Sequence, residues 1–318
     1  MPSDRARAEA WSRYWRAGGR VAARTGDAAE GLGPAFAAFW RRSLDSLKGA
    51  GPLLEVGAGT GAVARWLSQQ PSAPWIVASD LSQPRAADVA PLCFVAGARL
   101  EQLPFRDAAF GAVISQFAIE YAERSAAVVE VARVLAPGGR LALVLHRADG
   151  LLVRVARHER AHHDWVLEAD GLLDAAAGLV PYLARAATPQ GLAGLRGDPH
   201  AEQARQRYHA LQRQLEQRAA GPHGDCLWET NDALGRLLQQ ARAGAGPAVE
   251  AGLAQLRQSL LDARLRLEEL DRHALDGAGL QAWIEQLAAQ GVSHHRRCGE
   301  LEERGEALAW TLEVERAS

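Results

Sequence analysis

The residues best suited to chemistry are the glycines of the run Leu53–Gly61, where an apolar segment leads straight into a glycine turn. Gly57, Gly59 and Gly61 alternate with small residues, and Ala62–Leu67 then has the composition of a helix start. Glycines let a backbone approach a ligand closely, and the first N–H groups of a helix favour polar or anionic groups. The spacing therefore predicts a strand, a tight turn and a helix that together cradle a nucleotide.

Two kinds of nucleotide cofactor fit this turn. The residues Gly57-x-Gly59-x-x-Ala62 satisfy the loose dinucleotide pattern, and Asp80 lies at about the distance where an acid binds a ribose diol. Taken alone, this pattern would favour NAD. The complete run is E-x-G-x-G-x-G, however, beginning at Glu55 and including Gly61 as a third glycine.

The complete run resembles motif I of the class I S-adenosylmethionine (SAM) dependent methyltransferases. Further segments of that family's pattern follow in chain order, and the resemblance is continuous over about residues 49–146. These segments are a second strand in Trp75–Ser82, an "LPF.D..F" segment in Glu101–Phe110, a fourth strand in Ala112–Gln116, a helix and "PGGR" turn in Glu130–Arg140, and a fifth strand in Leu141–Leu145. The ordered set is more specific than the glycine turn alone, so we prefer SAM over NAD.

The resemblance implies an α/β fold, a Rossmann-like seven-stranded sheet with a terminal antiparallel hairpin. The residues after the fifth strand support this hairpin independently, because Ser293–Leu301 and Ala307–Val314 alternate in hydrophobicity around a turn at Glu303-Arg304-Gly305. Oxidoreductase Rossmann domains usually lack such a hairpin. The core is expected to comprise residues 49–150 and 277–318.

Two helical regions complete the predicted architecture. Residues 1–48 contain one helix over Ala8–Arg16 and another over Gly33–Leu47, separated by a Gly-rich break, and are expected to form an N-terminal lid. Within them Tyr14 and Trp15 are candidate lid residues, although anchoring of the helix on the sheet explains the aromatics equally simply. Residues 151–276 are rich in Ala, Leu, Arg, Gln and Glu and predict a large α-helical insertion.

Two apolar seams mark the helices of this insertion. Tyr208, Leu211 and Leu215 form a short seam at helical spacing, and a longer one runs from Leu253 to Leu270. The simplest arrangement of two successive seams is an antiparallel helical hairpin, and the second is a homodimer interface.

The resemblance assigns the cofactor site residue by residue. Glu55 orients the loop or approaches the methionine amino group, the glycines admit the methionine and ribose, and Asp80 accepts hydrogen bonds from both ribose hydroxyls. The alternative for Asp80 is a cap on the turn into Ser82. The expected cofactor-binding residues are Glu55, Gly57, Ala58, Gly59, Gly61, Asp80, Leu81, Leu100, Glu101, Gln116 and Phe117.

One position departs from the family's pattern. Relatives often carry an acid a few residues before the "LPF" sequence, where it accepts a hydrogen bond from the adenine amino group. Here that position is Arg99, which has no acceptor. Glu101 or a main-chain carbonyl is expected to take its place.

The candidates for acid–base chemistry are His146, Glu120 and Tyr121. Ser115–Tyr121 resembles an "SQFxxEY" segment in a bacterial branch of the family and follows the fourth strand, at the edge where open α/β sheets bind ligands. In that segment Gln116 and Phe117 are placed to contact the sulfonium, and the π-face of Phe117 favours a cation. His146 ends the fifth strand at the same edge and is the best candidate for a general base. Helix capping, packing and a polar strand end are the structural alternatives.

A second histidine pattern has a different chemistry. His158-Glu159-Arg160-Ala161-His162 spells the HExxH sequence of zinc proteases, but no third ligand is evident downstream. We therefore predict no metal. The cysteines Cys93, Cys226 and Cys298 are scattered, as in proteins of a reducing compartment.

Composition limits the choice of partner. The formal net charge is −2, and the arginines from Arg205 to Arg218 are interspersed with Glu202 and Glu216, which favours a solvated face over an RNA-binding stripe. No apolar run reaches membrane-spanning length, so a cytoplasmic protein is expected. The sequence predicts a SAM-dependent methyltransferase with a small-molecule acceptor. The alternatives are an RNA or protein methyltransferase, or a non-catalytic SAM-binding partner.

Overall fold

The computed structural model describes residues 4–16, 33–47, 51–71, 73–83 and 92–318. The Gly-rich break predicted between the first two helices lies outside these described residues. The chain divides into two compact units: one comprises the described residues up to Arg154 together with Glu269–Ser318, and the other is Val155–Glu268. Each unit is described by itself.

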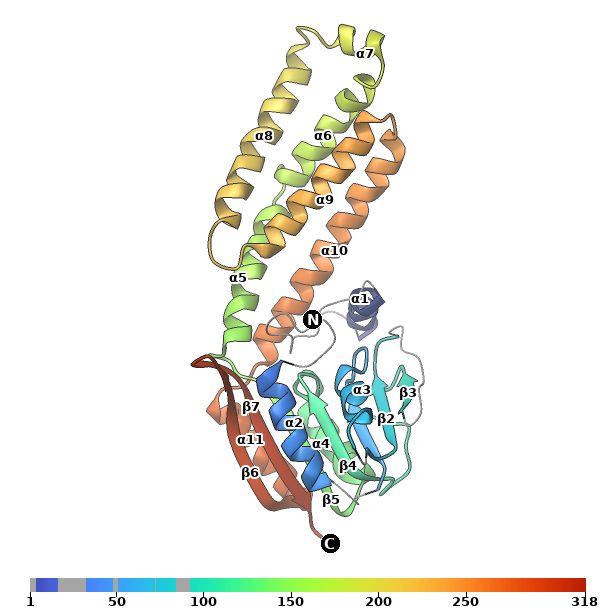
Figure 1. Ribbon diagram of the computed structural model, residues 1–318, viewed down its shortest axis with the longest axis vertical. Coiled ribbons are helices and arrows are strands. Elements are labelled where there is room, and N and C mark those ends of the chain that lie inside the picture. Colours follow the sequence, from blue (N-terminus) through green and yellow to red (C-terminus); the bar gives the residue numbers. More distant parts are fainter. Residues whose placement is uncertain (1–3, 17–32, 48–50, 72, 84–91) are drawn as a thin grey trace. The chain divides into compact units, whose positions relative to one another are not determined.

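The first unit is built on a seven-stranded sheet in the order β3-β2-β1-β4-β5-β7-β6 (Figure 1). All pairs from β3 to β5 are parallel, whereas β7 runs antiparallel to both β5 and β6. The strands are β1 (Leu53–Val56), β2 (Ile76–Asp80), β3 (Leu92–Ala96), β4 (Phe110–Gln116), β5 (Leu135–His146), β6 (Val292–Glu303) and β7 (Glu306–Arg316). The predicted Rossmann-like sheet with its terminal antiparallel hairpin is confirmed.

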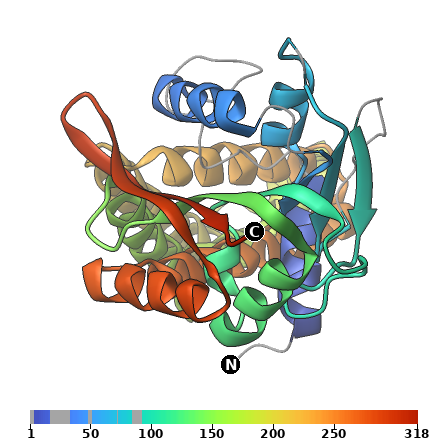
Figure 2. The same ribbon diagram turned by 90° about the horizontal axis from the view of Figure 1, so that it is seen from below.

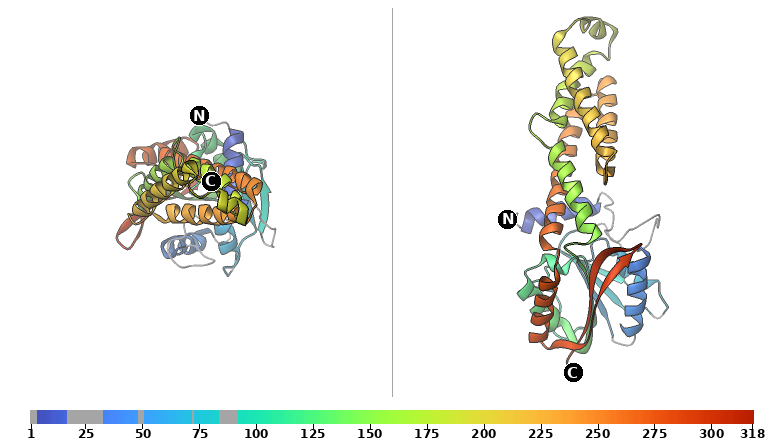
Figure 3. Two further views of the ribbon diagram at one scale, coloured as in Figure 1. Left: turned by 90° about the horizontal axis from the view of Figure 1, so that it is seen from above. Right: turned by 90° about the vertical axis from the view of Figure 1, so that its left-hand side faces the viewer.

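Helices cover both faces of this sheet. Figure 2 shows α2 (Pro34–Leu47) and α3 (Ala62–Ser68) on one face, and α4 (Arg124–Val134) and α11 (Gly277–Ala289) on the other. The right-hand view of Figure 3 shows the sheet edge-on between α2 and α11. Successive residues of a strand point to opposite faces of the sheet. Leu53 therefore lies in the hydrophobic core on the α2 side and Leu54 in the core on the α4 side, and both are fully buried.

The fifth strand is longer than the sequence pattern predicts. The predicted "PGGR" turn at 137–140 lies inside β5, which already pairs with β4 at Leu135. The register then shifts between the Phe110 and Ala112 pairings, and Gly138 has a φ of +69°. The glycines therefore form an irregularity within a strand rather than a turn before one, because Gly138 adopts the conformation that such a bulge requires.

Arg133 and Glu130 of α4 hold the "LPFRD" segment that precedes β4. Arg133 donates hydrogen bonds to the carbonyl oxygens of Leu103 and Phe105 at 3.0 and 2.7 Å, and to the carboxylates of Glu130 and Asp107 at 2.7 and 2.8 Å. Glu130 in turn accepts from the Leu103 N–H at 2.7 Å. This network fixes residues that directly follow Leu100 and Glu101, so it positions a wall of the site described below.

The second unit is helical. Its elements are the later part of α5 (Leu151–Val166), α6 (Leu172–Arg185), α7 (Pro189–Gly194), α8 (Pro199–Ala219), α9 (Asp225–Arg242) and most of α10 (Gly246–His273). The predicted seams of α8 and α10 share one buried core with α6 and α9. The predicted two-helix hairpin was therefore too simple, because Leu227, Leu234 and Leu238 give α9 an apolar face of its own.

Among the helices of the described residues, none combines the length and the apolar character that a membrane span requires.

We predict that Arg133→Met lowers the free energy of unfolding by about 2–3 kcal/mol, since the variant leaves the Leu103 and Phe105 carbonyl oxygens and the Glu130 carboxylate without their charged donor. Urea unfolding followed by circular dichroism measures the change. Arg106→Met is the matched control, because Arg106 is exposed on the same segment. Equal stability of the two variants would contradict the role assigned to Arg133.

Candidate functional site

A cavity of about 110 Å³ lies at the carboxyl edge of β1, β2 and β4. Ligands of open α/β sheets bind at this edge. The glycine turn and the end of β2 supply one wall, the segments after β3 and β4 supply others, and helix α1 (Asp4–Arg16) closes it. The lining residues are Arg7, Trp11, Trp15, Gly57, Ser79, Asp80, Leu81, Ala98, Arg99, Leu100, Glu101, Phe117, Ala118, Tyr121 and Ala122.

The glycine turn has a backbone that only glycine adopts without strain. Gly57, Gly59 and Gly61 have φ values of +66°, +56° and +75°. A Cβ on Gly57 would lie 2.1 Å from Cβ of Ala118, and one on Gly59 would lie 2.7 Å from the Trp15 ring. The predicted strand, tight turn and helix are therefore present, and their role in holding a nucleotide stays a prediction. Gly57 lines the cavity, whereas Ala58 and Gly61 support the turn without lining it.

Asp80 joins the end of β2 to this turn. Its Oδ2 accepts a hydrogen bond from the Gly59 N–H at 2.7 Å, and its Oδ1 accepts from the Ser82 N–H and hydroxyl at 2.7 and 2.6 Å. Burial raises the pKa of the Asp80 carboxyl, while these donors oppose the shift. Asp80 thus caps the turn into Ser82 and also lines the cavity beside Leu81, while its binding of ribose hydroxyls stays a prediction.

Glu55 holds the turn from below. Its side chain is buried, and Oε2 accepts a hydrogen bond from the Ala64 N–H at 2.9 Å, at the start of α3. Burial raises the pKa of this carboxyl to about 8. Of the two roles predicted for Glu55, the geometry matches orientation of the loop, because Glu55 does not line the cavity.

The segment after β3 forms the wall expected to face adenine. Arg99, Leu100 and Glu101 all line the cavity, and Arg99 Nε lies 3.7 Å from Glu101 Oε2. Glu101 Oε1 accepts from the Glu123 N–H at 3.1 Å. Glu101 therefore places a carboxylate on the same wall as Arg99, and its contact with adenine stays a prediction.

Gln116 and Phe117 diverge at the end of β4. The side-chain oxygen of Gln116 accepts from the buried Trp40 indole at 2.6 Å, so this side chain binds α2 and does not line the cavity. Phe117 lines the cavity and has a φ of +56°, which is rare for a residue with a bulky side chain. Such strain accumulates at functional sites.

Glu120, Tyr121 and His146 lie together. His146 Nδ1 is 2.8 Å from Glu120 Oε1, which also accepts from the His146 backbone N–H at 2.9 Å. This carboxylate favours the tautomer with a proton on Nδ1, and the buried Nε2 has no hydrogen-bond partner in the described part of the chain. The Phe117 ring stacks on the imidazole at 4.2 Å, and the Tyr121 ring contacts it edge-on at 5.8 Å. The imidazole therefore lies one layer behind the cavity wall.

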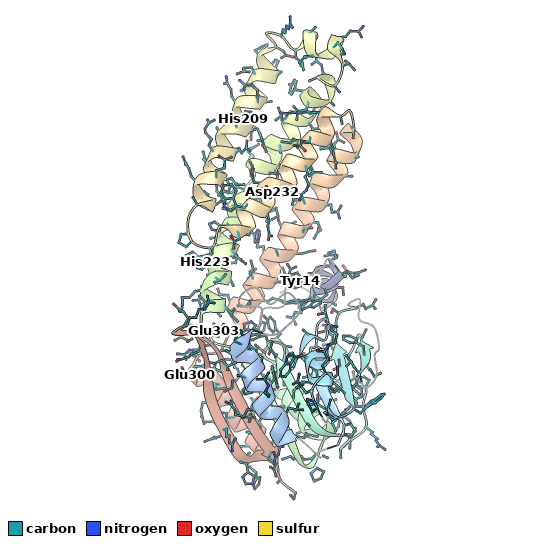
Figure 4. The ribbon with its side chains drawn as sticks, viewed as in Figure 1. Tyr14, His209, His223, Asp232, Glu300 and Glu303 are labelled. Carbon is teal, nitrogen blue, oxygen red and sulfur yellow. The ribbon has the colours of Figure 1, made fainter. Side chains whose placement is uncertain are left out.

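Helix α1 contributes residues that the sequence reasoning partly missed. Trp11 and Trp15 stack at 5.8 Å, and Tyr14, labelled on α1 in Figure 4, contacts the Trp15 ring at 4.8 Å. Arg7 lies one helical turn before Trp11, and its Nε donates to the fully buried Glu269 at 2.7 Å. The spacing of 7, 11 and 15 was the available signal, since residues four apart share a helix face.

The HExxH residues lie on α5, where the His158 ring is 5.2 Å from that of His223. Within the described residues, no group of three or more His, Cys, Asp or Glu side chains is placed to hold a metal ion.

Glu55 should make stability depend on pH. Its pKa is raised from 4.5 to about 8, so the folded protein keeps a proton that the unfolded chain loses, and stability falls as pH rises through this window. The variant Glu55→Gln stays neutral, and we predict that its free energy of unfolding rises relative to the native protein between pH 5 and about pH 8. Urea unfolding at several pH values measures this difference, with Glu285→Gln on the exposed face of α11 as control. Parallel pH curves for native and Glu55→Gln proteins would refute it.

The glycine turn and the lining residues from Gly57 to Ala122 fall within a region that matches known proteins. Residues 54–143 match the family model described as a methyltransferase domain. Over 109 residues the chain is 38% identical to the demethylmenaquinone methyltransferase of Mycobacterium marinum, a match that covers 32% of the chain and 46% of the relative. Over 121 residues it is 34% identical to the malonyl-acyl-carrier-protein O-methyltransferase of Alcanivorax borkumensis, and this match covers 35% of the chain and 40% of the relative.

The chain thus spans less than half the length of these curated relatives. A solved SAM-dependent methyltransferase of Mesorhizobium loti aligns with 35% of the chain and 55% of its own length at 22% identity, with a TM-score of 0.30. The family match falls on β1 to β5, the strands that build the glycine turn and the Asp80 edge. Residues 54–143 therefore match a methyltransferase domain, and S-adenosylmethionine is the cofactor of that domain.

Proposed function

We propose that the protein transfers a methyl group from SAM to a small-molecule acceptor and releases S-adenosylhomocysteine. The observation that carries this proposal is the convergence of three features on one cavity: bare backbone at Gly57, the Asp80 carboxylate, and an aromatic wall. The first two suit a ribose and an amino-acid chain, and the third suits a cation and an apolar acceptor.

The chain's own residues fit SAM at each end of the cavity. Asp80 would accept from the ribose hydroxyls, Glu101 would face the adenine amino group, and the turn from Gly57 to Gly59 would lie along the methionine. Phe117 and Tyr121 offer π-faces near the place where a sulfonium would sit. When bound, SAM supplies a methyl group already activated by its positive sulfur.

Helix α1 acts as a lid in this proposal. The cavity of about 110 Å³ is smaller than the roughly 300–1,000 Å³ usual for small-molecule sites. Trp15 packs directly on Gly59 and, with Trp11, fills part of the space above the glycine turn. Entry of a molecule the size of SAM therefore requires α1 to shift, and the return of α1 would exclude water.

Several observations support a small acceptor over RNA. The curated relatives are named for demethylmenaquinone and for a malonyl-acyl-carrier protein, and neither is named for RNA. The arginines of the helical unit are also engaged: Arg205 pairs with Glu202, Arg207 lies 3.6 Å from Asp170, and Arg218 lies 4.7 Å from the Trp165 ring. This leaves a mixed-charge face rather than a basic stripe.

The Glu120–His146 pair is the proposed proton acceptor for a protic acceptor group. Glu120 fixes the tautomer, so that Nε2 carries the basic lone pair. Tyr121 and Phe117 lie between the ring and the cavity and are the residues proposed to contact the acceptor, so proton transfer to Nε2 requires these two side chains to shift when the acceptor binds. Orientation of the acceptor against the methyl group supplies the rest of the rate enhancement.

A homodimer through the helical unit and a cytoplasmic location stay predictions. Trp228, Leu192 and Leu261 are exposed apolar residues of that unit, at 43%, 54% and 40%. Light scattering of the purified protein tests dimerisation.

The first functional test is transfer of labelled methyl from SAM into a cell extract that is then fractionated into small molecules, RNA and protein. We expect label in the small-molecule fraction with native protein. With Asp80→Ala we expect the label to be lost and SAM binding to weaken about 10- to 100-fold, because a charged acceptor is removed from the ribose. Asp232→Ala is the control, since Asp232 lies exposed on α9 (Figure 4).

Label confined to RNA or to protein would replace the small-molecule acceptor with one of those classes. Binding of SAM without label in any fraction would favour the non-catalytic alternative.

His146→Asn should lower the methyl-transfer rate about 100-fold or more, with unchanged binding of S-adenosylhomocysteine, if the imidazole takes the acceptor's proton. The control is His294→Asn on the exposed strand β6. Isothermal titration calorimetry checks binding, and initial rates of label transfer check turnover. A full rate in the His146→Asn variant would show that the pair only packs behind the aromatic wall.

A further inference from the structure

Arg7 is a charged residue in the cavity wall that the proposed function does not use. It lies in the first turns of α1, one helical turn before Trp11, and lines the cavity together with Trp11, Trp15 and Tyr121. Its side chain is only 20% exposed. A guanidinium buried to this degree needs an ionic partner, and the partner found among the described residues, Glu269, accepts from only one of its nitrogens.

Glu269 fixes the orientation of Arg7. The Arg7 Nε donates to Glu269 Oε1 at 2.7 Å, and the Glu269 side chain is fully buried. This bond uses the inner edge of the guanidinium. Among the described residues, the two terminal nitrogens of Arg7 have no hydrogen-bond partner within the geometric limits that the Glu269 contact meets.

The surroundings place this charge beside the reacting end of the cavity. Burial raises the pKa of Tyr121 and lowers that of His273, and the positive charge of Arg7 opposes the first shift and adds to the second, so the guanidinium lies close to both rings. Tyr121 and His273 contact each other at 5.3 Å, and Tyr121 also contacts the His146 ring. Arg7 therefore faces the same end of the cavity as the proposed proton acceptor.

A guanidinium clamped at Nε and open at its two terminal nitrogens matches a carboxylate, which accepts two parallel hydrogen bonds from such a fork. The neighbouring wall is aromatic, with Trp11, Trp15 and Tyr121, while the other guanidinium of the cavity lining, that of Arg99, lies 3.7 Å from the Glu101 carboxylate. We propose that Arg7, oriented by Glu269, binds the carboxylate of a ligand in this cavity. This inference rests on the proposed function, which supplies two sources of a carboxylate: the methionine portion of SAM, or the acceptor itself.

The test compares ligands with and without a carboxylate. S-adenosylhomocysteine carries one, whereas 5′-methylthioadenosine keeps the adenosine and the thioether but lacks the amino-acid portion. Benzoate and benzyl alcohol, added to protein saturated with S-adenosylhomocysteine, make the same comparison for the acceptor. Isothermal titration calorimetry gives the dissociation constants of all four for the native protein and for Arg7→Gln.

We expect Arg7→Gln to weaken only the carboxylate ligand of one pair, by about 10- to 100-fold. If the variant binds S-adenosylhomocysteine more weakly but binds 5′-methylthioadenosine as the native protein does, Arg7 binds the carboxylate of the cofactor. If binding of both nucleosides is unchanged, and binding of benzoate is lost while binding of benzyl alcohol is not, Arg7 binds the carboxylate of the acceptor. Glu269→Gln should shift the same ratio in the same direction by a smaller factor, because the guanidinium stays charged but loses its clamp.

Two variants keep the result interpretable. Removal of the Arg7 charge leaves Glu269 buried without a cation, which costs stability, so Arg7→Lys is included because it keeps the charge and loses the fork. Arg13→Gln is the control on the same helix, where Arg13 pairs with Glu9 at the surface. Unfolding temperatures confirm that each variant is folded.

Equal weakening of both members of a pair would overturn the proposal, because it would mean that Arg7 only fastens α1 in place. Unchanged binding of all ligands would overturn it as well. Failure of the native protein to bind either nucleoside would instead refute the proposed function.

Discussion

The site depends on one backbone constraint, the left-handed conformation of three alternating glycines between β1 and α3. Gly57, Gly59 and Gly61 turn the chain sharply enough to bring the start of α3 back over the strand. The Gly59 N–H then reaches the carboxylate of Asp80 at the end of the neighbouring strand. Because this bond joins β1 to β2 across the sheet edge, the turn and the acid form one rigid unit.

The polar groups behind this edge are held by partners that a low-dielectric interior requires. Glu55 accepts from the Ala64 N–H, and Glu120 accepts twice from His146. Burial raises the pKa of Glu55 to about 8, so this carboxyl is close to neutral at physiological pH and can remain in the core. The edge of the sheet thus combines a bare backbone surface with buried polar groups that accept hydrogen bonds from the protein itself.

Helix α1 brings a different kind of chemistry to the same place. Its face with Arg7, Trp11 and Trp15 closes the cavity opposite the glycine turn, and Glu269 ties that face to the end of α10. Residues that begin the chain and residues near 270 therefore meet beside Tyr121. Trp11 and Trp15 line the cavity and Trp15 packs on Gly59, which is the basis for the proposed movement of α1 on cofactor entry.

The sequence alone determined the fold class, the cofactor, and which motif follows each strand, because these features depend on local patterns. Alternation specifies the hairpin β6–β7, and the run Glu55–Gly61 specifies the turn. The tertiary structure decided the rest. Three features depend on residues far away in the chain. Gln116 binds Trp40, the "PGGR" residues lie within β5 through its pairing with β4, and Arg7 pairs with Glu269. Such contacts have no local signature, since they arise only when distant elements pack together.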